Sequence, residues 1–134
     1  MAILQQQELN KIKSAIPDLQ CFIVGSRTIE NVKSNDVDVL VLVESPLSKE
    51  ETKSMRRTFY AICPKGEYSL VFNWAKDNTR LKELFPYYDL KTDDHKYVDR
   101  DKMTFEEYDI LKMRLYNTRF KAKRFYKENA DGRD

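Results

Sequence analysis

Histidine and cysteine are scarce in this chain of 134 residues, and each scarcity excludes a kind of site. The single histidine, His95, excludes a metal site built on paired histidines and leaves little room for serine–histidine or cysteine–histidine catalysis. The two cysteines, Cys21 and Cys63, lie in apolar stretches, as buried free thiols do in a reducing compartment. We therefore expect a cytoplasmic protein.

The chain also lacks a long apolar run and a large net charge. The longest run, residues 37–43, is interrupted by Asp38 and falls far short of the ~20 residues that span a bilayer. The amino terminus is too polar for a secretory signal, so we expect no membrane contact. The net charge is only +2, which by itself does not argue for nucleic acid.

Glycine is the third scarce residue, and this makes each of the three glycines informative. Gly66 follows Pro64 and Lys65, which is typical of a turn. Gly25 instead follows directly on the apolar stretch 20–24, where a missing side chain usually allows close approach by backbone or ligand. Gly25 is therefore the glycine for which we expect a functional reason.

The apolar pattern predicts a single domain of the α/β (α+β) class, with a small mixed β-sheet flanked by helices. Strands are expected at residues 20–24, 37–43 and 67–74, and 37–43 is expected to be central because it is apolar on both faces. We place the core at about residues 1–75 and a helical extension at about 76–128.

Capping residues predict where several helices begin. The first expected helix is 2–15, and the second runs from the capping box at Ser48 to about Ile62. A short third helix is expected to be capped by Asp77 and to end before Pro86. The last and longest is expected to run from the capping box at Thr104 to about Glu128. One stripe of the long helix is apolar and should pack on the domain. Residues 86–103 are expected to be irregular.

Two carboxylates, Asp36 and Asp38, stand at the start of the central strand. Residues two apart on a strand point to the same face, about 7 Å apart along it. From there both could ligate one divalent ion, or the pair of ions used in phosphoryl transfer. Mg²⁺ suits such a site because it prefers oxygen ligands and is often held by one or two carboxylates plus substrate phosphates, and Mn²⁺ is the alternative.

The Gly25-Ser26 pair offers backbone N–H groups and a hydroxyl at the end of a strand, where phosphate oxygens can be held. Arg27 could then stabilise the departing pyrophosphate, and Lys33 is a further cation close to the acids. The Gly25-Ser26 pair and the two acids, each taken alone, also have a simpler interpretation. A Gly-Ser pair after a strand is often only a turn, and an acid at the start of a strand is often only solvated.

Taken together, Gly25-Ser26 followed by Asp36-x-Asp38 and Val-Leu-Val resembles the signature of the nucleotidyltransferase superfamily (DNA polymerase β-like fold), in particular the minimal nucleotidyltransferases. The resemblance covers about residues 1–75, and its specific part is 22–43. It implies that Gly25 and Ser26 bind a nucleoside triphosphate such as ATP and that Asp36 and Asp38 bind two magnesium ions. A third carboxylate on a later strand would complete the site.

The third carboxylate is where this sequence departs from the family. On the strand 67–74 the family would place an aspartate before the apolar run, and this chain has Ser69 there. Glu67 lies on the same strand face one pleat earlier and is the candidate substitute. The departure affects the expected catalysis more than the expected fold or nucleotide binding.

Three other features of the sequence have both a structural and a functional interpretation. The C-terminal stretch 111–127 is basic and contains no acidic residue, so it could be a solvated helix face or could contact RNA phosphates through Lys121, Lys123 and Arg124. The consecutive Asp93, Asp94 and His95 are more typical of a solvated loop than of a metal site. Three aromatic residues could stack on a nucleobase or pack in the core, namely Trp74, Tyr87 and Tyr88.

The first functional hypothesis is a magnesium-dependent transferase that moves a nucleoside monophosphate from a triphosphate to a hydroxyl of RNA, protein or a small molecule. In it Asp36, Asp38 and Glu67 are catalytic. The alternative is a weak or inactive member of the same fold that acts by binding, for example as an antitoxin or a viral effector, with a partner protein or as a homo-oligomer.

Overall fold

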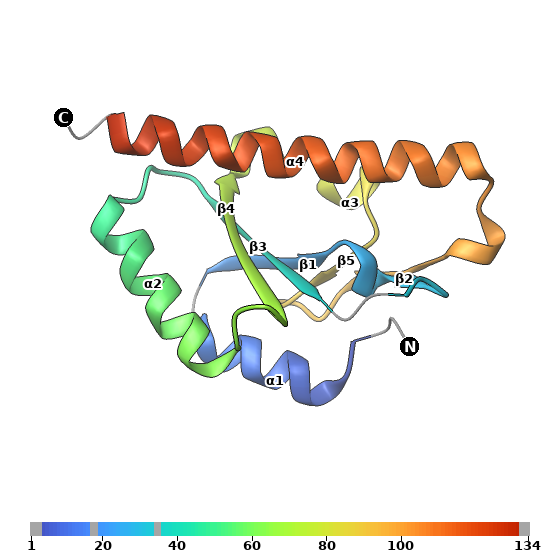
Figure 1. Ribbon diagram of the computed structural model, residues 1–134, viewed down its shortest axis with the longest axis horizontal. Coiled ribbons are helices and arrows are strands. Elements are labelled where there is room, and N and C mark those ends of the chain that lie inside the picture. The colour runs from blue at the N-terminus through green and yellow to red at the C-terminus, as the bar shows by residue number, and fades with distance from the viewer. Residues whose placement is uncertain (1–3, 17–18, 34–35, 132–134) are drawn as a thin grey trace.

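A computed structural model describes residues 4–16, 19–33 and 36–131, and within the last helix it describes side chains only as far as Thr118. A mixed β-sheet lies between two layers of helices, as expected from the apolar pattern (Figure 1). The long C-terminal helix α4, Phe105–Asp131, crosses one face of the sheet. Helices α1, Gln6–Ala15, and α2, Lys49–Ile62, cover the other face.

The sheet has five strands in the order β4-β3-β1-β5-β6. Their bounds are β1 Gln20–Val24, β3 Val37–Val43, β4 Tyr68–Trp74, β5 Tyr87–Asp89 and β6 His95–Lys96. Strands β3 and β4 are parallel and are joined through α2, whereas the other neighbouring pairs are antiparallel. The position of β3 inside the sheet confirms the expectation of a central strand.

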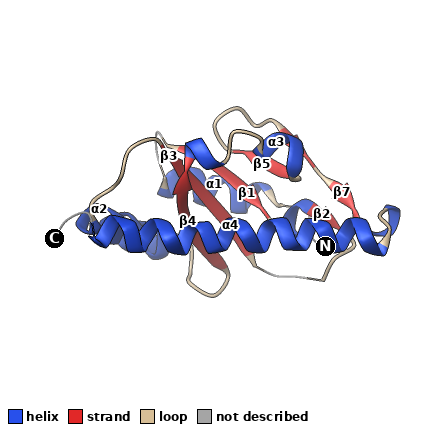
Figure 2. Cartoon of the chain, turned by 90° about the horizontal axis from the view of Figure 1, so that it is seen from above, coloured by secondary structure: helices blue, strands red, loops and turns tan. Residues whose placement is uncertain are grey.

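The alternating side chains of the strands form two cores, one on each face of the sheet. Val37, Val39 and Val41 pack with the helices α1 and α2, and Leu40 and Leu42 pack on the face that α4 covers. Because this period of two also applies to Asp38, its side chain lies on the α4 face. Figure 2 shows α4 lying across this face of the sheet, so the strand alternation turns one acid of the motif toward the side that α4 covers.

The predicted capping boxes are both present. At the start of α2, Glu51 N–H donates to the Ser48 hydroxyl at 3.0 Å, and Ser48 N–H donates to the Glu51 carboxylate at 2.9 Å. At the start of α4, Thr104 and Glu107 exchange the same two bonds at 2.8 and 3.1 Å. These bonds satisfy N–H groups that a helix terminus otherwise leaves open.

Residues 86–103 are not irregular, and this expectation is wrong. Strand β5 joins the central sheet beside β1, and β7, Val98–Asp99, pairs with β2, Ile29–Glu30, in a small second sheet. These strands are short, so sequence periodicity gives little sign of them. Core residues such as Leu81 and Phe85 also follow residue 75, so the packed core extends beyond the N-terminal part of the chain.

Asp77 does not cap the helix that follows it. It ends the 3₁₀ turn η2, Ala75–Asp77, and the short helix α3, Leu81–Leu84, begins after Arg80 without a side-chain cap. None of the helices in the described part of the chain combines the length and the apolar character needed to cross a membrane.

Candidate functional site

Gly25 lies where β1 ends and the 3₁₀ turn η1, Ser26–Thr28, begins. Its φ of 85° and ψ of −156° lie in a region that is essentially restricted to glycine. A Cβ atom built on Gly25 would lie 2.6 Å from Oδ2 of Asp38, closer than real Cβ contacts. The close approach expected at this glycine is therefore made by the carboxylate of Asp38.

Asp38 reaches Gly25 because β1 and β3 are antiparallel and Val24 pairs with Asp38. The pairing places the end of β1 beside the start of β3, so the two halves of the motif meet at one edge of the sheet. The Oδ1 atom of Asp38 is buried. This carboxylate is therefore part of the packed structure as well as a potential ligand.

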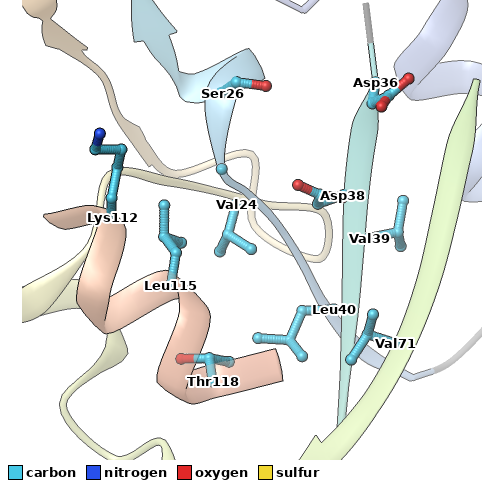
Figure 3. A pocket seen from close by; sticks show the side chains of 11 residues that line it. Val24, Ser26, Asp36, Asp38, Val39, Leu40, Val71, Lys112, Leu115 and Thr118 are labelled. Carbon is cyan, nitrogen blue, oxygen red and sulfur yellow. The ribbon is translucent and has the colours of Figure 1, made fainter. Parts of the chain in front are cut away.

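A pocket of about 320 Å³ opens at this edge, between the sheet and α4 (Figure 3). Its polar wall contains Gly25, Ser26, Asp36 and Asp38, so the structure brings together four of the residues predicted from the motif. The remaining lining comes from the sheet and from α4: Val24, Val39, Leu40, Val71, Lys112, Leu115 and Thr118.

The two acids of the motif do not point the same way. Figure 3 shows the carboxyl group of Asp38 turned toward β1 and Ser26, whereas that of Asp36 is turned to the other side of β3. Asp36 precedes the strand and is exposed, so the period of two that holds within β3 does not extend to it. The two carboxylates therefore do not converge in this structure.

The third acid is also missing from the pocket. Ser69 pairs with Asp38 across the parallel β3–β4 ladder, which is the position where the resemblance implies a carboxylate. Glu67 lies in the turn before β4 with an exposed side chain, and its backbone carbonyl accepts a hydrogen bond from Val37 N–H at 2.9 Å. Glu67 is not among the residues that line the pocket.

These placements bear on the predicted metal. Within the described residues, no three histidine, cysteine or carboxylate side chains come together in a group that could hold a metal ion. Of the two carboxylates that line the pocket, only that of Asp38 is turned toward Ser26, where it offers the oxygen ligand that Mg²⁺ prefers; such an ion is often completed by phosphate oxygens and water. The donors fit one divalent ion that arrives with a phosphorylated ligand, and they do not fit a preformed two-ion centre.

Arg27 and Lys33, the two cations predicted to bind the nucleotide, are not among the residues that line the pocket. The guanidinium group of Arg27 is buried and forms a bidentate pair with Glu8 of α1, with N–O distances of 2.6 and 2.8 Å. This pair ties η1 to the helical layer opposite α4. Lys33 is exposed in the loop that precedes β3.

The cation that does line the pocket is Lys112 of α4, which the motif did not indicate. It is an exposed residue next to the buried Leu111, and its ammonium lies 5.0 Å from the centre of the Tyr108 ring. The sequence signal was the basic stretch 111–127, but that stretch does not say which turn faces the sheet. The side chains of Lys121, Lys123 and Arg124 lie outside the described residues.

The loop that contains Asp93 and Asp94 has a structural role. Asp93 accepts hydrogen bonds from Lys13 at 2.6 Å and from the Tyr88 hydroxyl at 2.7 Å. Asp94 accepts a bond from the Tyr87 hydroxyl at 2.7 Å. The pKa of each carboxyl is held below its ordinary value by these bonds.

The aromatic residues near this loop pack within the fold. Tyr87 and Tyr88 are buried, and the ring of His95 is stacked on that of Tyr88 with 5.5 Å between the ring centres. Trp74 is half-buried, and its ring lies 5.1 Å from the Lys76 ammonium. None of these three aromatic residues lines the pocket, so their position favours core packing over base stacking.

The arrangement as a whole can hold an anionic ligand against a glycine-containing turn, with a carboxylate on one side and an ammonium on the other. Comparison of the chain with protein-family models and with curated proteins finds no match. A functional interpretation of this pocket therefore rests on its residues and their placement.

Proposed function

We propose that this pocket binds a nucleoside triphosphate together with one divalent cation, and that the protein is a nucleotidyltransferase-like binding protein in which nucleotide transfer is slow or absent. The observation that carries the proposal is the meeting of Gly25, Ser26 and Asp38 in one pocket, with Lys112 on the facing helix. The turn after β1 supplies Gly25 and Ser26, β3 supplies Asp38, and α4, far away in the sequence, supplies Lys112.

Phosphate groups would lie at the polar end of the pocket. The backbone at Gly25 and Ser26 borders it, and the Ser26 hydroxyl points toward the side on which the acids lie (Figure 3). Lys112 adds a positive charge from α4. The apolar lining suits the base and sugar, and a volume of about 320 Å³ lies at the small end of the range for ligand pockets.

The charges of the pocket make the expected binding depend on a cation. Of the side chains that the structure describes, two carboxylates and one ammonium line it, so a triphosphate alone would meet net repulsion. A divalent ion shared between Asp38 and the phosphates would neutralise part of this charge. We therefore expect tight binding only when Mg²⁺ or Mn²⁺ is present.

Transfer chemistry is less well supported than binding. Ser69 stands beside Asp38 in place of a third carboxylate, Asp36 is turned away, and Glu67 lies outside the pocket. Among the residues that the structure describes, no second carboxylate is thus placed to accept the proton of an attacking hydroxyl beside Asp38. These placements favour the binding or regulatory hypothesis over an efficient transferase.

Calorimetry with each of the four triphosphates, with and without Mg²⁺, tests the binding proposal. We expect removal of the cation to weaken binding at least ~10-fold, and Lys112→Ala to weaken it about 10-fold, because a charge-assisted hydrogen bond contributes about 1.5–3 kcal/mol. Asp38→Asn should remove most of the dependence on the cation. Lys53→Ala is the matched control, because Lys53 is an exposed lysine of α2, on the opposite side of the sheet.

Failure to bind any triphosphate at millimolar concentration with Mg²⁺ would refute the proposal, as would equal affinities of Lys112→Ala and Lys53→Ala. The question of catalysis needs a separate assay. Labelled triphosphates are incubated with RNA and with protein acceptors, and the double variant Asp36→Ala with Asp38→Ala is the blank. Turnover well above that blank would restore the transferase hypothesis.

A further inference from the structure

The outer face of α4 is unusually apolar for the surface of a helix that already packs on a sheet. Four of the five exposed large hydrophobic side chains in the described part of the chain lie on this helix. They are Phe105, Ile110, Met113 and Tyr116, with exposed fractions of 74%, 49%, 60% and 68%. Single exposed apolar residues are ordinary, but a cluster of them marks an interaction surface.

These residues form a second apolar stripe on α4, separate from the apolar stripe that packs on the sheet. Ile110, Met113 and Tyr116 follow one another at intervals of three, so they share one side of the helix. Leu111, which is 5% exposed, and Leu115 face the sheet on the opposite side. A helix that only covers a sheet would carry polar residues outward, so this outer stripe needs a partner.

The charges along α4 suggest which partner it is. Glu106, Glu107 and Asp109 precede the centre of the stripe, whereas Lys112 and Arg114 flank Met113, and no acidic residue occurs from there to Lys127. The first turns of the helix are thus acidic, and the stretch 112–127 that follows them is basic. An antiparallel helix of the same sequence would place opposite charges side by side at both ends.

We propose that two copies of this chain pair through the outer faces of their α4 helices, antiparallel, about a two-fold axis close to Met113. Such an interface is isologous, so each favourable contact occurs twice. RNA or an acidic protein would instead meet repulsion from the acidic N-terminal turns of α4. A single helix pair is smaller than a typical stable interface of about 800 Å² per partner, so the dimer should dissociate in the micromolar range.

Pairing through this face leaves the nucleotide pocket open, because Leu115 and Thr118 face the sheet and the outer stripe faces away. Dimer formation and triphosphate binding are therefore independent properties. The association can be measured without nucleotide, so a negative result for either one leaves the other intact.

Sedimentation equilibrium of the full chain, from about 1 to 200 μM, tests whether the dimer forms. We expect the wild type to dimerise and Met113→Asp to raise the dissociation constant at least ~10-fold, with the attraction weaker in high salt. Ile62→Asp is the matched control, because Ile62 is an exposed apolar residue of α2 and should leave association unchanged. Unchanged circular dichroism shows that both variants fold. A wild type that is monomeric at 200 μM, or equal effects of the two substitutions, would overturn the proposal.

Single cysteine substitutions test the orientation of the pair. Met113→Cys should form an intermolecular disulfide on mild oxidation, because the two copies of this position face each other near the axis. Phe105 lies eight residues away, so its two copies would be about 24 Å apart in an antiparallel pair, too far for a disulfide. Both natural cysteines are buried and should not interfere. Cross-linking of Phe105→Cys as well would indicate a parallel pair and overturn the proposed arrangement.

Discussion

Replacing Gly25 by alanine should destabilise the fold through two separable effects. The first is backbone strain, because a φ of 85° with a ψ of −156° costs a non-glycine residue about 1–3 kcal/mol. The second is the contact of the new Cβ with Oδ2 of Asp38, 2.6 Å away, which forces the carboxylate to move. Displacing a packed group costs about 1–3 kcal/mol more, a large part of a total stability of about 5–15 kcal/mol.

A double-mutant cycle separates the two effects. In an Asp38→Ala background the nearest remaining atom of residue 38 would be its Cβ, 3.6 Å from the new methyl group, which is an ordinary contact. Gly25→Ala should then cost only the backbone strain, so the coupling free energy between the two positions should be about 1–3 kcal/mol. Asp38→Asn keeps the shape of the side chain and should preserve the coupling.

Urea unfolding followed by circular dichroism measures each free energy. Gly66→Ala is the matched control, because Gly66 also has a positive φ, of 102°, but has no atom within 4 Å of the added Cβ. It should show backbone strain alone. If Gly25→Ala costs no more than Gly66→Ala, or if the cycle shows no coupling with Asp38, then the carboxylate is not what requires a glycine here.

Three further predictions concern groups outside the pocket. Glu8→Gln should lower the free energy of unfolding by about 3 kcal/mol, because it removes the carboxylate paired with the buried Arg27, and it should leave triphosphate affinity unchanged in calorimetry. The carboxyl groups of Asp93 and Asp94 have a lowered pKa in the folded protein, so their stabilisation is present above the ordinary pKa of 3.8 and is lost as the pH falls through the lower, folded value. Acid unfolding of the double asparagine variant should therefore depend less steeply on pH, and an unchanged acid limb would contradict this. Burial raises the pKa of Cys63 to about 11, so its thiol should react slowly with iodoacetamide at pH 7.5 until urea unfolds the chain, whereas rapid labelling of the native protein would argue against this packing.

The elements that carry local signals could be predicted from the sequence. The capping boxes at Ser48 and Thr104 lie within four residues of chain, and they mark the starts of α2 and α4 as the structure has them. The run 37–43, which is apolar on both faces, likewise predicted β3 and its central position. The short strand β5 could not be predicted in this way, because its place beside β1 depends on contacts with residues far away in the chain.

The sequence motif also predicted part of the candidate site, and the rest depended on contacts between distant segments. The motif indicated Gly25, Ser26 and Asp38, and these residues meet because strands β1 and β3 pair in register. It also indicated Arg27, and no local pattern shows that this side chain pairs with Glu8 of α1 instead. Lys112 was missed because only the packing of α4 decides which of its many cations faces the sheet.

The sequence by itself determined the order of the main elements, the layered α/β class and the presence of a glycine-serine turn followed by two acids. Only the tertiary structure decided that Asp38 lies against Gly25, that Asp36 turns away, and that α4 has a second, outward-facing apolar stripe. Helix caps and strand periodicity arise from neighbours along the chain, so they can be read locally. The direction of a side chain and the partner of a charge depend on the packing of distant segments, which the chain specifies only when it folds as a whole.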